Sequence, residues 1–171
     1  MLKKVSIPIG IFEGFRLVDR SEITDQWVRW LADQRDWSTF ITLTFKDPIG
    51  QEAALEVWHR LVRTLNKQVV GEHYTRIVKH SYFSYCLGIE RQLRGCLHFH
   101  GIVDRPIDFE LIHRYWNKAA GWAWIDKIND RDGALEYLTK YITKRGEIMP
   151  YLAAPPPYEL KPGKAFTWWI V

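Results

Sequence analysis

Residues 87–103 read LGIERQLRGCLHFHGIV and predict a β-hairpin. Apolar residues alternate with polar ones along both arms, and this period of two is typical of strands with one buried face. His98 and His100 are two positions apart on the second arm. Both side chains therefore leave the same face of the sheet.

The length of the hairpin loop decides whether Glu90 shares that face. A two-residue turn at residues 93–94 turns Glu90 to the opposite face. A three-residue loop at residues 93–95 instead pairs Glu90 with His98, and it places a glycine where such a loop favours a left-handed residue. We expect the three-residue loop, because this register also aligns the apolar residues of the two arms on the other face.

In this register Glu90, His98 and His100 converge on one point. One carboxylate and two imidazoles suit a divalent ion with open coordination positions, such as Mg²⁺, Mn²⁺ or Zn²⁺. A His-x-His pair in a strand is by itself more often a pair of half-buried polar residues, so the predicted metal site depends on the matching position of Glu90. Cys96 lies on the same face but close to the turn, and we leave it out of the ligand set.

Residues 136–144 read EYLTKYITK and predict a helix with two different faces. Tyr137, Lys140, Tyr141 and Lys144 follow spacings of three and four, so they form one stripe of phenols and ammonium groups. Apolar residues form a second stripe that can dock on a core. Such lysines suit an enzyme that attacks phosphate through tyrosine, since cations stabilise both the phenolate and the phosphate. The alternative is a surface helix whose aromatic rings pack on lysine stems.

Three short motifs occur in the order that is typical of the HUH endonucleases, which initiate rolling-circle replication, and the chain resembles that family. Residues 40–45 look like the first motif, an apolar-threonine strand. Residues 98–100 match the two-histidine motif, and Glu90 stands where many viral and phage initiators carry a third ligand. Residues 137–144 are similar to the doubled nucleophile motif of the two-tyrosine initiators of small single-stranded-DNA phages and some plasmids. The resemblance covers roughly residues 40–144.

This resemblance implies that Tyr137 cuts single-stranded DNA by transesterification and remains joined to the new 5′-phosphate. It implies Mn²⁺ or Mg²⁺ as the cofactor, and it leaves open whether Tyr141 makes a second cut or only packs. The expected site residues are Tyr137, Tyr141, Lys140 and Lys144 for catalysis, Glu90, His98 and His100 for the metal, and Arg91, Arg94, Thr42, Thr44 and Arg145 for DNA binding.

The resemblance also implies the partners. These are single-stranded DNA at a hairpin-associated replication origin and a helicase from the host or from a fused region outside these residues. The chain contains no phosphate-loop motif of the Gly-x-x-x-x-Gly-Lys-Ser/Thr type, so we expect no ATPase here. No signal peptide or membrane span is visible in the sequence, and we expect a protein of the cytoplasm of a prokaryotic host with no membrane partner.

The whole pattern predicts an α+β fold, with a central antiparallel β-sheet of about five strands flanked by helices. The resemblance describes this further as the ferredoxin-like or RRM-like core of an HUH endonuclease. We expect the endonuclease domain at residues 1–150, with its core at about 38–146, and a Pro-rich linker and C-terminal extension of unknown role at 151–171. The expected helices are residues 24–36, 51–70, 108–119 and 132–145, and the expected strands are residues 38–46, 81–90, 96–103 and 122–128, with one more near Val5.

Composition agrees with a polyanionic partner. The chain has 171 residues, a net charge of +4 and a pI of about 9.1, which is a mild basic bias. Nine tryptophans offer stacking surfaces for single-stranded DNA. A structural role is the stronger interpretation for most of them, since Trp27, Trp30 and Trp58 follow helical spacing and Trp122 and Trp124 alternate as on a strand. We expect at most two or three to contact DNA. Cys86 and Cys96 are not opposite each other in the expected register, so we expect no disulfide.

Other functions remain open from the sequence. A conjugative relaxase usually has three histidines and an N-terminal tyrosine, and this chain has neither pattern. A single-strand transposase of the same chemistry also places its tyrosine late on a helix. A single-strand-binding module with a degraded site is a second alternative, and a small metallohydrolase with bystander tyrosines is a third.

Overall fold

A computed structural model gives the fold of the chain and describes residues 20–78, 80–92, 95–143 and 147–153. The predicted α+β class, with a five-stranded antiparallel sheet and flanking helices, is confirmed. The elements are α1 (Arg20–Gln34), β1 (Thr39–Phe45), α2 (Gln51–Val70), a short 3₁₀ turn η1 (Tyr74–Arg76), β2 (Tyr85–Arg91), β3 (Leu97–Val103), α3 (Phe109–Ala119), β4 (Gly121–Lys127), α4 (Arg131–Thr143) and β5 (Glu147–Tyr151).

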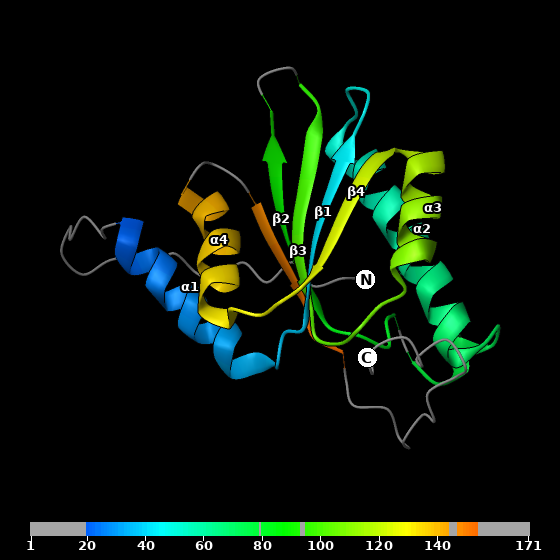
Figure 1. The fold of residues 1–171 in the computed structure, drawn as a ribbon, viewed down its shortest axis with the longest axis horizontal. Coiled ribbons are helices and arrows are strands. Elements are labelled where there is room, and N and C mark those ends of the chain that lie inside the picture. The colour runs from blue at the N-terminus through cyan, green and yellow to red at the C-terminus, as the bar shows by residue number, and fades with distance from the viewer. Residues whose placement is uncertain (1–19, 79, 93–94, 144–146, 154–171) are drawn as a thin grey trace.

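The sheet has the strand order β4-β1-β3-β2-β5, and every neighbouring pair is antiparallel. Figure 1 shows this sheet between two pairs of helices, with α1 and α4 on one side and α2 and α3 on the other. The predicted hairpin is β2 and β3. Its register pairs Glu90 with His98, and Gly95 has φ of 85°, so the prediction of a three-residue loop with a left-handed glycine is confirmed.

One face of the sheet forms the main core with α2 and α3. Ile41, Leu43 and Phe45 alternate along β1 and point into it, each at most 2 % exposed. Trp116 of α3 is fully buried against Phe45, and its indole N–H donates a hydrogen bond to the carbonyl oxygen of Thr44 at 3.1 Å. This core fixes the position of β1 inside the sheet, between β4 and β3.

The opposite face is covered by α1 and α4 over only part of its area. Leu31 of α1 and Leu135 and Leu138 of α4 form a second buried cluster with Cys86 and Ile102 of the sheet. The other end of this face carries Thr42 and Thr44 of β1, which are partly exposed, and two exposed tryptophans of β4. The candidate site lies where the covered part of the face meets the open part.

Several elements differ from expectation, and the first helix spans Arg20–Gln34 rather than residues 24–36. The strand expected near Val5 lies outside the described residues, and the fifth strand is β5, which was not predicted because Pro150 cannot donate to a ladder. β5 is an edge strand, where proline is tolerated. β2 begins at Tyr85 rather than Ser81. Side chains bind the backbone N–H groups before it: Asn66 accepts from Tyr82, the Ser81 hydroxyl accepts from Phe83 and Asp104 accepts from Ser84.

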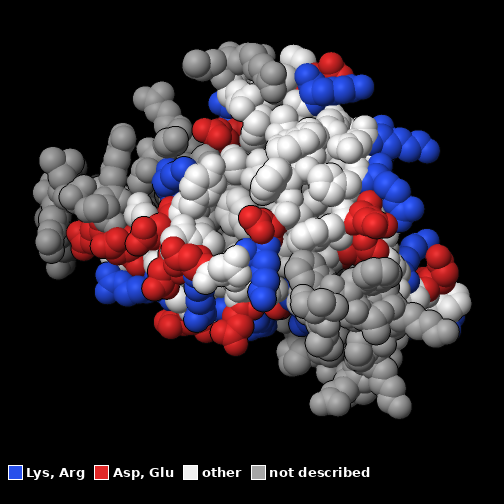
Figure 2. All heavy atoms as spheres, viewed as in Figure 1, with Lys and Arg blue, Asp and Glu red and all other residues white. Residues whose placement is uncertain are grey.

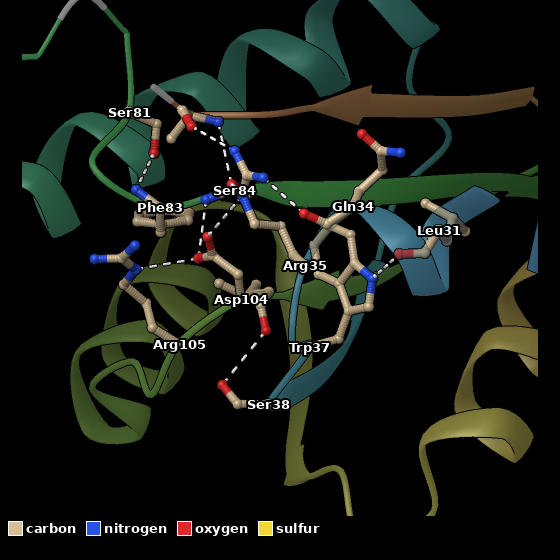
Figure 3. A network of polar contacts seen from close by, with 12 residues as sticks. Leu31, Gln34, Arg35, Trp37, Ser38, Ser81, Phe83, Ser84, Asp104 and Arg105 are labelled. Atoms are coloured by element: carbon tan, nitrogen blue, oxygen red, sulfur yellow. Dashed lines mark hydrogen bonds and ion pairs between the residues drawn. The ribbon is translucent and has the colours of Figure 1, made fainter. Parts of the chain in front are cut away.

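A polar network ties the other end of the hairpin, far from its loop, to α1 and the end of β5 (Figure 3). The Arg35 guanidinium donates to the Ser84 hydroxyl at 3.1 Å and to the carbonyl oxygen of Ala153 at 2.8 Å. The Asp104 carboxylate, which is 5 % exposed, accepts from Arg105 at 3.1 Å and lies 3.9 Å from Arg35. The network anchors α1 and the chain after β5 to the same point of the sheet.

The environment of His80 leads us to expect that the free energy of unfolding depends on pH. Its Nε2 lies 3.0 Å from the Tyr85 hydroxyl, and burial lowers its pKa below 6.5, an effect to which the neighbouring His59 adds. The unfolded chain therefore takes up a proton as pH falls through about 6.5, before the folded chain does. We expect the free energy of unfolding to decrease as pH falls from 7.5 to about 5. Urea titrations at several pH values should show a shallower decrease for His80→Gln, and an unchanged pH dependence would contradict this.

Within the described ranges, none of the helices combines the length and the apolar composition that are needed to span a bilayer.

Candidate active site

Cross-strand pairing assembles the predicted ligands on the partly covered face. Thr42 of β1 is opposite His100 of β3, and Thr44 is opposite His98. On the other side of β3, Glu90 of β2 is opposite His98. Because side chains alternate between faces along each strand, all five leave the same face of the sheet.

His100 is the most buried of the predicted ligands, at 5 % exposure, and its Nε2 lies 3.4 Å from a carboxylate oxygen of Glu90. Burial lowers the pKa of His100 to about 4, although the Glu90 carboxylate acts in the opposite direction. At neutral pH the imidazole is therefore uncharged, which is the form that binds metal ions.

Two threonines of β1 contact the Nδ1 atoms of the histidines. The Thr42 hydroxyl lies 3.3 Å from His100 Nδ1, and the Thr44 hydroxyl lies 3.5 Å from His98 Nδ1. For His100, this arrangement directs Nε2 toward Glu90 on the neighbouring strand. A partner on one ring nitrogen fixes the orientation of the ring and selects the nitrogen that binds a metal.

Removing these hydroxyls is expected to weaken metal binding. The Thr42→Val and Thr44→Val variants keep the shape of the side chain but lose the contact to Nδ1, and we expect roughly 10-fold to 100-fold lower affinity for Mn²⁺. Isothermal titration calorimetry would measure the affinity of each variant for Mn²⁺. Thr64→Val is a matched control, because the Thr64 hydroxyl donates a hydrogen bond within α2, to the carbonyl oxygen of Arg60. Equal affinities in all the variants would contradict an orienting role.

Glu90 and His100 fit a shared divalent ion, whereas His98 has to reorient. Two ligand atoms on adjacent positions of one ion with bonds of about 2.1 Å lie about 3.0 to 3.4 Å apart, which agrees with the 3.4 Å between Glu90 and His100. The ring centroids of His98 and His100 are 6.0 Å apart. As they stand, no three His, Cys, Asp or Glu side chains of the described residues are grouped so that they hold a metal.

Tyr137 lies beside these histidines. Leu135 and Leu138 bury the apolar stripe of α4, as expected, and this docking leaves Tyr137 next to the sheet. The Tyr137 ring is 5.6 Å from the His100 ring, measured between centroids, and its side chain is 41 % exposed. Lys140 Nζ lies 3.3 Å from the centroid of the Tyr137 ring. Strand and helix thus bring together a phenol, a cation and the candidate ligands.

Of the remaining predicted residues, Arg91 has a described side chain, and it lies away from this point. Tyr141 belongs to α4, but its side chain lies outside what is described, and so do Arg94, Lys144 and Arg145. Arg91 follows Glu90 in β2, so its side chain leaves the opposite face. Its guanidinium donates to the carbonyl oxygen of Gly95 at 2.9 Å, across the hairpin loop.

An open cleft of about 440 Å³ continues from the site toward β4. It lies between β1, β4, the loop after β4 and α4, and its lining includes Phe40, Thr42, Trp124, Asp126, Asn129 and Tyr137. The sequence pattern placed Trp122 and Trp124 on a strand without assigning them a role. Their side chains are 51 % and 53 % exposed, and the signal that identifies them is their position opposite Thr44 and Thr42.

Comparisons with known proteins give one match. Residues 38–146, more than half of the chain, match the model of a family of replication-associated proteins, the ORF2 type. No curated protein and no solved structure matches the chain.

Proposed function

This chain belongs to the ORF2-type family of replication-associated proteins, and from that premise we propose that it nicks and rejoins single-stranded DNA through a tyrosine to initiate rolling-circle replication. The observation that carries the proposal is the position of Tyr137, whose ring lies 5.6 Å from that of His100 and beneath the ammonium group of Lys140. These residues come from a helix and a strand that are well separated in the sequence.

In the proposed reaction the Tyr137 phenol oxygen attacks the scissile phosphorus. A bond forms between this oxygen and the phosphorus, and the bond from the phosphorus to the 3′ oxygen breaks. The phenol proton is lost and the leaving 3′ oxygen gains a proton, which gives a 5′-phosphotyrosine and a free 3′-hydroxyl. Lys140 stabilises the negative charge of the phenolate and the phosphate. Because the phosphotyrosyl ester conserves the bond energy, the reverse reaction rejoins the strand without ATP.

Glu90, His98 and His100 would hold a divalent ion, Mn²⁺ or Mg²⁺, in this site. When bound, the ion supplies positive charge to a non-bridging oxygen of the scissile phosphate. The neutral imidazole of His100 and the carboxylate of Glu90 provide the ligand atoms that already lie at a suitable separation. Thr42 contacts the ring of His100 from the other side, and Thr44 contacts the ring of His98, which would have to reorient to reach the ion.

The two-tyrosine mechanism is the finer part of the proposal. Tyr141 lies one turn after Tyr137 in α4, so both residues belong to the same side of the helix. A second phenol there would cut again while the first still holds DNA, which suits repeated rounds of replication. The proposed partners are single-stranded DNA of a replication origin and a helicase outside this chain.

Covalent capture tests the proposal and its dependence on metal. The protein is incubated with single-stranded oligonucleotides that contain origin-like hairpins, and a shifted band on a denaturing gel reports the adduct. We expect an adduct with Mn²⁺ or Mg²⁺, its loss to background in EDTA, and its return when metal is restored. Mass spectrometry after nuclease digestion would locate the modified tyrosine.

Each alternative function predicts a different result. Cut DNA released without an adduct indicates a metallohydrolase, and binding without cutting on any substrate indicates a binding module. An adduct that EDTA does not affect contradicts the metal site. A replication initiator and a single-strand transposase both form the adduct, and they differ in whether it forms on a replicon origin or on the ends of a mobile element.

A further inference from the structure

Two tryptophans of the edge strand β4 form an exposed aromatic surface. Trp122 and Trp124 are 51 % and 53 % exposed, and their ring centroids are 5.9 Å apart with 36° between the ring planes. Large aromatic side chains usually lose most of their exposed area on folding. Two of them side by side on one face of an edge strand therefore indicate a surface that meets a ligand.

This surface is continuous with the candidate active site. Trp124 is opposite Thr42 and Trp122 is opposite Thr44, and the same threonines contact His100 and His98 on the next strand. With neighbouring strands about 4.8 Å apart, the tryptophans lie about 10 Å from the histidines across the sheet. A strand of DNA whose phosphate is at the histidines would pass over the tryptophans if it leaves the site toward this edge of the sheet.

The cleft beside Trp124 has the chemistry of a nucleobase site. Trp124, Phe40 and Tyr137 contribute aromatic walls, and Asp126 and Asn129 contribute polar groups. Asp126 and Asp130 outnumber Lys127 among the lining residues. Because carboxylates repel phosphate, this balance favours entry of the base over the backbone on this side. A carboxylate accepts hydrogen bonds, and the amino group of cytosine is a donor that can provide one. Thymine has no amino group to donate.

The charge distribution agrees with stacking rather than with phosphate binding. In Figure 2 a large part of the surface over the strands is uncharged, and most acidic and basic side chains lie toward the border of the view, apart from one acidic and one basic side chain next to each other near its middle. Nonspecific binding of single strands commonly combines aromatic stacking with basic residues that follow the backbone.

We infer that Trp122 and Trp124 form a stacking platform for unpaired bases of single-stranded DNA, and that the cleft beside Trp124 takes one base that carries an amino group. The inference rests on the proposed function for the identity of the strand, and it names the residues that hold the nucleotides flanking the cut. The platform positions the DNA and takes no part in bond formation.

Binding without chemistry tests the platform. Fluorescence anisotropy of a labelled single-stranded oligonucleotide is measured in EDTA, so that no cutting occurs. We expect Trp122→Ala and Trp124→Ala each to weaken binding by roughly 5-fold to 100-fold, and the corresponding phenylalanine variants to retain most of the affinity. Thermal unfolding checks that the variants fold, which we expect because both side chains are half exposed.

The cleft has its own test. In oligonucleotides that differ at one position, a cytosine-to-thymine change should weaken binding to the wild type, and Asp126→Asn should reduce this difference. No difference between the two oligonucleotides at any position would overturn the assignment of the cleft to a base with an amino group. Unchanged affinity in both alanine variants, or no binding of single-stranded DNA by the wild type, would overturn the platform.

These results are separable from those of covalent capture. An adduct that forms normally in alanine variants with unchanged DNA affinity leaves the proposed function intact and removes the platform. If the alanine variants bind DNA more weakly but the wild type forms no adduct, the platform is supported and the proposed nicking function is not. If sedimentation shows a wild-type dimer that Trp122→Ala or Trp124→Ala dissociates while DNA affinity is unchanged, the surface is instead an interface between two copies of the chain.

Discussion

Tyr137→Phe is expected to form the covalent DNA adduct about 1000-fold more slowly than the wild type, or not at all. Phenylalanine keeps the ring that packs against Phe40 and His100 and the contact with Lys140, but it lacks the oxygen that attacks the phosphate. The substitution therefore removes the nucleophile and leaves the packing of α4 in place. DNA affinity and thermal stability should remain close to those of the wild type, and the gel assay reports the loss of the adduct.

Two further variants show whether the loss of the adduct is specific to Tyr137. Tyr115→Phe removes a phenol from α3, which packs on the other face of the sheet, and should form adduct at the wild-type rate. Tyr141→Phe tests the second tyrosine of α4. An adduct that survives in Tyr137→Phe and is lost in Tyr141→Phe would transfer the main role to Tyr141. An adduct that survives in the double variant would place the nucleophile outside this helix.

Gly121→Ala is expected to reduce the free energy of unfolding by about 3 kcal/mol, with a decrease in Tm of about 6 to 12 °C. A Cβ atom at Gly121 would clash with the carbonyl oxygen of Thr44 and would lie 2.8 Å from the backbone nitrogen of Lys46. Both atoms belong to the backbone, so no side chain can rotate to make room. The start of β4 would have to move away from β1. The Thr44 carbonyl cannot easily move instead, because it also accepts a hydrogen bond from the Trp116 indole.

Urea unfolding followed by circular dichroism would measure this loss. Gly50→Ala is the matched control, because a Cβ there meets no atom within 4 Å and Gly50 has φ of −70°, which any residue adopts. We expect the control to change the free energy of unfolding by less than about 1 kcal/mol. Equal stabilities of the two variants would mean that the β1–β4 contact is not limited by the space at Gly121.

Local patterns predicted the hairpin well, because its determinants are local. The alternation of apolar residues and the position of Gly95 are enough to select the register that pairs Glu90 with His98. The apolar and phenol stripes of α4 are likewise visible as spacings of three and four. In both cases each side chain is placed by the geometry of its own strand or helix.

The rest depends on packing between elements that are far apart in the sequence. Periodicity predicts that Tyr137 shares a stripe with Lys140, but the contact with His100 exists only because α4 docks on the sheet through Leu135 and Leu138. The cleft beside Trp124 forms where β4, its following loop and α4 meet. The edge strand β5 was missed because a proline argues against a strand unless the edge position is already known.

All three candidate ligands come from one hairpin, between Glu90 and His100. Their common face depends on how many residues separate Gln92 from Gly95, and not on which residues these are. The chain should therefore accept many substitutions at residues 93 and 94, but not the insertion or deletion of a single residue. Such a change would keep all three ligands in the sequence. It would still shift the register of the hairpin and turn the Glu90 carboxylate to the face of the sheet opposite the two imidazoles.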